Sequence, residues 1–172
     1  LDNRYHGLLR QGGPPEWPPS PYRLFQALLA GLARCNELDG LLGGVLRWLE
    51  RRDPPLIIAP CSREGRTVRR FVPNNDSDRK PDRQDRLTAK TLCPTLMLGT
   101  AVVHYLWVVQ EQDMESVQRL CQAARHLSAL GWGIDMAYAT ASVITDSEIP
   151  HLHGVRWRPR PEVVSDTGLL RT

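Results

Sequence analysis

A proline-rich run near the amino end constrains this chain more than any other feature of its sequence. Residues 11–21 (QGGPPEWPPSP) contain five prolines and two glycines. Proline fixes φ and lacks a backbone N–H, so the run is unsuited to a helix interior or a central strand. We therefore expect a rigid, extended loop. It separates Arg4–Gly7, which we interpret as the end of a first strand, from the elements that follow.

Apolar spacing predicts three helices after this loop. Ser20–Asn36 starts with serine at the N-cap and proline at the first helical position, and its leucines recur at helical spacing. Leu42–Arg52 ends at a double proline, because a residue before proline avoids the helical region. Met114–Leu130 has one apolar face and ends at a glycine-rich turn.

Runs of β-branched and apolar residues predict the strands. Leu56–Ala59, Leu96–Val109 and Met136–Ile144 are expected to form one antiparallel sheet, and Thr67–Val72 a further arm. With the helices, this order indicates an α+β fold of the ferredoxin-like or RRM-like type, with an insertion between the middle strands.

The predicted architecture divides the chain at residue 148. Residues 1–148 would form the domain, with the helices 20–36 and 114–130 on one face of its sheet. Residues 149–172, rich in arginine, proline and valine, would form an extended segment that leaves it.

Basic charge concentrates in the insertion between Arg63 and Lys90. This stretch has nine basic and five acidic residues, whereas the net charge of the whole chain is only +3. Long loops of this kind are usually functional, and clustered cations neutralise the phosphates of a single strand. The interleaved aspartates indicate internal ion pairs too, and a solvated loop is the other interpretation. The candidate phosphate-binding residues are Arg69, Arg70, Arg79, Lys80, Arg83, Arg86 and Lys90.

The type of basic residue also favours binding to RNA. Of the 22 basic residues, only Lys80 and Lys90 are lysine. Arginine binds phosphate with two donors and stacks on bases, as an RNA-binding surface requires. A GC-rich genome produces the same bias, so composition by itself leaves both explanations open.

Metal and membrane chemistry have little support. The four cysteines (Cys35, Cys61, Cys93 and Cys121) form no C-x-x-C pair, which favours reduced thiols and a cytoplasmic protein. His151 and His153 share a strand face but have no further ligands nearby, so we expect no metal and no cofactor. The chain has no apolar run long enough to span a membrane, and we expect no membrane partner.

Two aromatic positions are candidates for function. His6, beside Tyr5, is the best placed residue for acid–base work on a phosphodiester, and a stacking or hydrogen-bonding role is the other interpretation. Trp17 is held by prolines on both sides of its loop. It is suited equally to a preformed stacking surface and to a plug in the core.

Five ordered motifs resemble one protein family. They are Arg4-Tyr5-His6, Glu16-Trp17-Pro18-Pro19-Ser20-Pro21-x-Arg23-Leu24-Phe25, Val72-Pro73-x-Asn75-Asp76, Leu130-Gly131-Trp132-Gly133-Ile134-Asp135-Met136 and Gly168-Leu169-Leu170-Arg171. They are similar to the handle-binding half of a CRISPR-associated RAMP subunit of type I-G (formerly I-U) effector complexes. In that family a metal-independent crRNA-processing module follows, so residues 149–172 would lead toward it.

The resemblance implies a structural role in antiviral defence. Such subunits cap the 5′ handle of the guide RNA, and a long hairpin, here residues 63–90, is inserted as a thumb beside the neighbouring backbone subunit. The implied partners are crRNA, backbone RAMP subunits and the large subunit, with target DNA as a further candidate. RNA contacts are expected from the insertion and from Arg4, Tyr5, His6, Trp17, Arg23 and Trp132.

Two other function classes stay open at this point. One is a metal-independent endoribonuclease that uses Tyr5 and His6, although the resemblance places processing in the other module. The second is an assembly module whose thumb contacts only protein. The expectation for this segment is that it is not catalytic.

Overall fold

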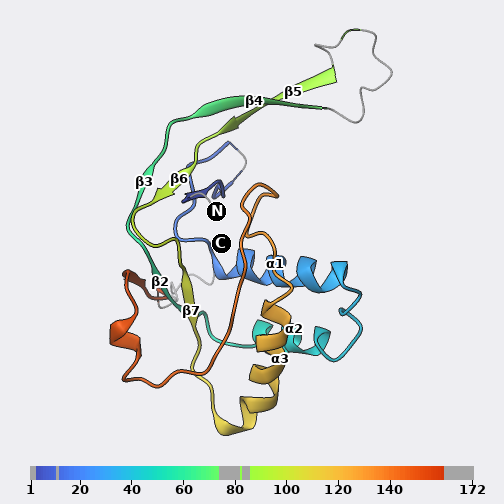
Figure 1. Cartoon of the computed structure of the whole chain (residues 1–172), viewed down its shortest axis with the longest axis vertical. Coiled ribbons are helices and arrows are strands. Elements are labelled where there is room, and N and C mark those ends of the chain that lie inside the picture. Colours follow the sequence, from blue (N-terminus) through green and yellow to red (C-terminus); the bar gives the residue numbers. More distant parts are fainter. Residues whose placement is uncertain (1–2, 11, 74–81, 83–85, 161–172) are drawn as a thin grey trace, which may run out of the picture.

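The three helices form the core of the protein, together with the residues that follow the third. The computed structural model describes residues 3–10, 12–73, 82 and 86–160. Helices α1 (Pro21–Arg34), α2 (Gly43–Glu50) and α3 (Met114–Ala124) contact one another, and Figure 1 shows them gathered on one side of the strands. A helix is present within each of the three predicted ranges. The buried side chains of the core cluster are Ala27, Leu28, Leu32, Val45, Leu46, Leu49, Ala123, Ala124 and, just beyond α3, Leu127.

Helix α3 is shorter than its apolar spacing predicts. It ends at Ala124 and not at Leu130. Tight turns follow, in which the N–H groups of His126 and Leu127 donate to carbonyls three residues earlier. The side chain of Leu127 is nevertheless 5% exposed, because the turn carries it back onto the helical cluster. The apolar spacing therefore predicted the burial of Leu127 correctly, but it predicted wrongly that the backbone after Ala124 is helical.

One sheet has the order β7-β2-β8. The central strand β2 (Leu56–Ala59) pairs antiparallel with β7 (His104–Leu106) and with β8 (Val155–Trp157). The predicted strand at Leu56–Ala59 is confirmed. Part of the segment 149–172 thus lies in a sheet, while the proposed domain boundary at residue 148 stays a prediction.

The predicted strand Leu96–Val109 is two strands in two sheets. Thr95–Met97 forms β6, and His104–Leu106 forms β7. Gly99 lies between them with φ of 89°. This conformation is open to glycine and strained for other residues, and it breaks the strand where the chain passes from one sheet to the other.

The prediction of a strand at Met136–Ile144 is wrong. Apart from a bridge between Ala129 and Met136, this segment belongs to no sheet in the described part of the chain. The alternation that motivated the prediction is present, since Ala137, Ala139 and Ala141 pack against the helical cluster while Tyr138 is 78% exposed. Alternate burial needs only one covered face, whereas a strand also needs a neighbour with which to pair its backbone.

The remaining strands build a small sheet and a projecting hairpin. β1 (Arg4–Tyr5) and β3 (Ser62–Glu64) flank β6. β4 (Val68–Pro73) and β5 (Leu87–Leu92) form an antiparallel hairpin, which Figure 1 shows extending away from the helices. The α+β class with antiparallel sheets is confirmed, and the arrangement is compatible with the expected sandwich carrying a hairpin insertion.

A glycine in α1 tests the helical core. A Cβ built on Gly31 would lie 2.5 Å from the carbonyl oxygen of His126, so the backbones of α1 and of the turn after α3 approach too closely for a side chain. We expect Gly31→Ala to lower the free energy of unfolding by about 1–3 kcal/mol through overpacking. Urea unfolding followed by circular dichroism measures this change.

Gly44 in α2 is the matched control. A Cβ there would meet only a guanidinium nitrogen of Arg119 at 3.9 Å. Gly44→Ala should leave stability unchanged or raise it by up to about 1 kcal/mol, the helix propensity difference. Equal destabilisation by the two substitutions would contradict the close approach at Gly31.

Candidate nucleic-acid interface

β1 places two of the predicted residues on a basic cleft. Arg4 and His6 alternate with the buried Tyr5, so both lie on the opposite side of the strand. The cleft has a volume of about 310 Å³ and lies where the small sheet meets the base of the hairpin. It is lined by Arg4, His6, Arg66, Val68, Arg70, Leu92, Pro94 and Leu96.

The residues that line the cleft are rich in positive charge. Three of them are arginines, Arg4, Arg66 and Arg70, and the described lining residues include no Asp or Glu. Like charges that converge in one concavity raise the local concentration of anions, and guanidinium groups match the geometry of phosphate. The arrangement is therefore suited to binding an anionic ligand such as a nucleic-acid backbone.

A buried carboxylate fixes the position of His6. Asp135 is 6% exposed, and its carboxylate accepts hydrogen bonds from the backbone N–H of His6 at 3.1 and 3.2 Å. The His6 Nδ1 lies 2.7 Å from Asp135 Oδ1. The loop of Asp135 is thereby attached to the residue that follows β1.

A second buried carboxylate organises the proline-rich loop. Glu16 accepts a hydrogen bond from the backbone N–H of Ser20 at 2.9 Å and pairs with the guanidinium of Arg23. Arg23 also donates to the carbonyl oxygen of Leu8 at 2.5 Å. A buried charge must be paired, and this pair joins the loop, the start of α1 and the chain after β1. Arg23 was predicted to contact RNA, and in the structure its guanidinium is engaged within the protein.

Tyr5 and Trp17 pack against each other beneath β1. Their rings meet edge to face with centroids 6.1 Å apart, and the indole N–H of Trp17 donates to the carbonyl oxygen of Pro60 at 3.2 Å. Burial and the nearby Glu16 raise the pKa of Tyr5, so its phenol stays protonated at neutral pH. These contacts favour the core-plug interpretation of Trp17 over the stacking surface.

Glycine is required where the aromatic ring of Tyr5 meets the loop of Asp135. Gly131 has φ of 104°, and a Cβ on it would lie 3.2 Å from that ring. Trp132 follows directly, is half-buried, and its backbone N–H lies 3.3 Å from Asp135 Oδ2. The structure thus brings the loop of Trp132 close to β1 in space, and the RNA contact expected of Trp132 stays a prediction.

The hairpin separates two arginines that are neighbours in sequence. Arg70 lies opposite Lys90 and lines the cleft, so the two cations share one face of the ribbon. Arg69 points to the other face, where its guanidinium lies 5.5 Å from the ring centroid of Phe71. Arg86 precedes β5 and is exposed. The other predicted residues of the insertion, Arg79, Lys80 and Arg83, lie outside the described residues.

Sequence reasoning missed three residues of this site. Arg66 lies in the basic stretch 63–90 but is not among the predicted phosphate-binding residues. Its place just before β4 brings it to the cleft. Glu16 and Asp135 stand in the quoted motifs, and an acidic residue within an apolar motif signals a buried partner. Only the fold shows which cation or backbone group each one pairs with.

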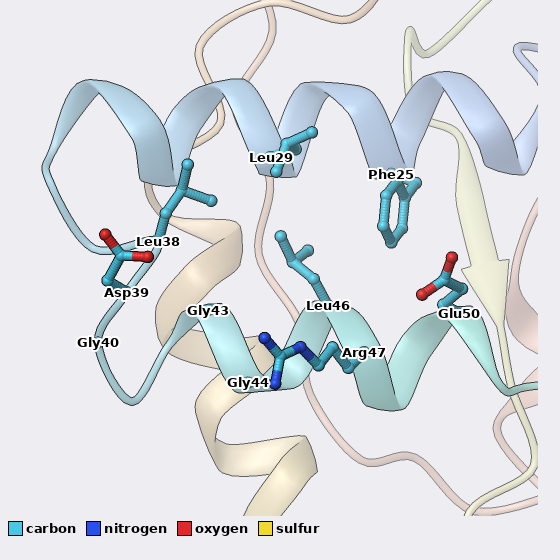
Figure 2. A pocket seen from close by; sticks show the side chains of 10 residues that line it. All are labelled: Phe25, Leu29, Leu38, Asp39, Gly40, Gly43, Gly44, Leu46, Arg47 and Glu50. Carbon is cyan, nitrogen blue, oxygen red and sulfur yellow. The ribbon is translucent and has the colours of Figure 1, made fainter.

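A second hollow of about 360 Å³ lies between α1 and α2, away from this site. Figure 2 shows Phe25 and Leu29 of α1 facing Leu46 of α2, with Asp39 and Glu50 toward its two ends. Apolar, acidic and basic residues line this hollow together, so charge of one sign does not converge there as it does in the basic cleft.

Metal ligation and membrane insertion find no support within the described ranges. They contain no group of three or more His, Cys, Asp or Glu side chains that could hold a metal ion. No helix there has the length and apolar character needed to cross a membrane.

Substitution of Trp17 tests whether its side chain stabilises the fold or stacks on RNA. Because its ring contacts Tyr5 and its N–H is bonded to Pro60, we expect Trp17→Ala to lower the free energy of unfolding by about 2–4 kcal/mol. Trp17→Phe keeps the ring contact and should lose only about 1 kcal/mol, the value of one hydrogen bond. Urea unfolding gives both values. A stable Trp17→Ala variant with weakened RNA binding would favour the stacking surface instead.

The chain was also compared with known proteins. It matches the family model described as CRISPR-associated protein, GSU0054 family, over residues 4–172. No curated protein and no solved structure matches it. The match includes β1, the proline-rich loop, the hairpin and the loop of Asp135, and on this evidence the chain belongs to the GSU0054 family of CRISPR-associated proteins.

Proposed function

We propose that this protein is a structural subunit of a type I CRISPR effector complex that binds the guide RNA and caps its 5′ handle. The observation that carries the proposal is the basic cleft at the base of the hairpin, where Arg4, Arg66 and Arg70 converge beside His6. Membership of a CRISPR-associated family supports a role in CRISPR–Cas defence.

The cleft is suited to the backbone of a single RNA strand. Arginine forms paired, charge-assisted hydrogen bonds with phosphate oxygens, and such contacts position a strand without reading its sequence. In a guide-containing complex sequence is read by base pairing, so the protein needs to hold the RNA backbone and recognise the shape of the handle. The apolar side chain of Val68, which is 41% exposed in the same cleft, is able to contact sugars or base edges.

The other face of the hairpin supports contact with protein subunits. Phe71 is 59% exposed, although exposed aromatic side chains are more typical of interfaces than of free surfaces. We assign this face to a neighbouring backbone subunit of the RAMP type, while the large subunit and target DNA remain further candidate partners. The hairpin would then separate RNA on the Arg70 face from protein on the Phe71 face.

Arg70 and Arg69 test the assignment of the two faces. Arg70→Gln should weaken binding of a single-stranded RNA with the repeat sequence roughly five- to tenfold at low salt. It should also reduce the magnitude of the salt slope by about 0.7, the value for one phosphate contact on a single strand. Fluorescence anisotropy across a series of salt concentrations measures both quantities.

Arg69→Gln is the matched control on the neighbouring position. Its side chain lies on the other face, so RNA affinity and salt slope should stay close to those of the unmodified protein. If both variants bind RNA as the unmodified protein does, the cleft is not the RNA site and a module that contacts only protein becomes the better description.

The endoribonuclease alternative has a separate test. Tyr5 is buried and protonated, which leaves His6 as the candidate acid–base group of the pair. We expect no cleavage of repeat RNA by this chain in EDTA, because no second acid–base group faces the cleft among its described lining residues. Gel analysis of end-labelled RNA decides this, and cleavage that His6→Ala abolishes would establish the enzyme.

A further inference from the structure

Helix α1 is apolar on two of its faces. One face contributes Leu28 and Leu32 to the helical core. A second stripe recurs at the same helical spacing and consists of Tyr22, Phe25 and Leu29. Phe25 and Leu29 are only half-buried at the edge of the core, and Tyr22 is 70% exposed. A surface helix needs one apolar face, and a helix that is apolar on more sides is normally covered by a further neighbour.

The hollow of about 360 Å³ between α1 and α2 lies along this second stripe. Figure 2 shows Phe25 and Leu29 on one wall and Leu46 on the other. Part of the lining has no side chains, because it consists of Gly40, Gly43 and Gly44. Glycine is required at the second of these positions, since a Cβ on Gly43 would overlap the carbonyl oxygen of Leu38. The close approach of this loop to α2 therefore leaves the hollow unfilled.

Two carboxylates mark the ends of the hollow. Figure 2 places Asp39 at one end and Glu50 at the other, with Arg47 of α2 between them. All three side chains are exposed. Neither carboxylate forms an ion pair with another residue in the described part of the chain. The hollow thus combines an apolar floor with a negative charge at each end and a positive charge in between.

We propose that this hollow docks an amphipathic helix of a partner protein, with apolar residues along one face and arginine or lysine at both ends. The eight residues of α2 give a wall about 12 Å long, which matches two to three turns of a bound helix. Apolar side chains at i, i+4 and i+7 of that helix would contact the second stripe of α1. The hollow lies away from the basic cleft, so this proposal does not rest on RNA binding.

The chemistry of the walls selects this occupant. Both walls are helices whose backbone hydrogen bonds are internal, so they offer no edge to an extended strand. Side chains on adjacent helices form ridges and grooves into which a third helix packs. The carboxylates of Asp39 and Glu50 repel the phosphates of a nucleic acid and attract cationic side chains. Arg47 between them pairs with one acidic residue near the middle of the partner helix.

Binding of designed peptides to the intact chain tests the proposal. The probe is a fluorescein-labelled helical peptide of about 14 residues, or four turns, with leucines at i, i+4 and i+7, one central glutamate and an arginine at each end. The control peptide has the same composition, with its leucines distributed around the helix. Fluorescence anisotropy should show saturable binding of the probe, with an affinity roughly tenfold or more above that of the control, because only the probe buries its leucines together.

Exchange of charge between protein and peptide locates the bound helix. In the double variant Asp39→Lys, Glu50→Lys, affinity for the arginine-ended probe should fall roughly three- to tenfold. A probe with glutamate at both ends should recover the lost affinity. The matched control Glu64→Lys, Asp146→Lys changes the net charge equally at exposed positions outside the hollow. This control should leave the preference for arginine ends unchanged.

Three results would overturn the proposal. The first is equal binding of the probe and the control peptide, or no binding of either at saturating concentration. The second is the same change of preference in both double variants, which circular dichroism shows to be folded. The third is a different occupant of the hollow. Self-association of the unmodified chain that Asp39→Lys, Glu50→Lys abolishes would assign the hollow to a second copy, and competition by single-stranded RNA for the bound probe would assign it to nucleic acid.

Discussion

The site depends on two buried carboxylates that hold distant parts of the chain against the first strand. Glu16 and Asp135 are each 6% exposed, and a charge so far removed from water is tolerated only with close partners. Glu16 pairs with Arg23 near the start of α1, and Asp135 pairs with His6. Each pairing joins a loop to the region of β1, so removal of either carboxylate would leave buried donors without partners.

This anchoring gives the basic cleft its shape. His6 is held from behind by Asp135, and the ring of Tyr5 on the opposite side of the strand packs on Trp17. The exposed side of β1 is thereby presented to the hairpin base, where Arg66 and Arg70 complete the cleft. The strand and the ribbon fix the backbone of these arginines, so the entropic cost of binding phosphate falls on their exposed side chains alone.

The sequence predicted those elements whose backbone hydrogen bonds are made within one segment. It failed for elements whose backbone must pair with a second segment. Helices α1 and α2 follow from caps, prolines and apolar spacing because the hydrogen bonds of a helix are local. The strand predicted at Met136–Ile144 failed because pairing depends on a partner that alternation does not reveal, although its alanines do lie on the core. In the site, the RNA contacts expected of Arg4, His6 and Trp132 stay predictions, and the structure adds that the side chains of Arg23 and Trp17 are hydrogen-bonded within the protein.

The sequence by itself determined helices α1 and α2, the proline-rich loop and the basic charge of the insertion, since these depend on local conformational preference and composition. The residues alone did not predict β5, the second strand of the hairpin. Only the tertiary structure decided which cations converge. Arg69 and Arg70 are adjacent in sequence and alike in chemistry, yet the two-residue period of a strand sends them to opposite faces of the ribbon. Arg4 and Arg70 are far apart in sequence and line one cleft, because β6 pairs with β1 and continues from the hairpin. Long-range strand pairing is a property of two segments at once, so neither segment encodes it alone.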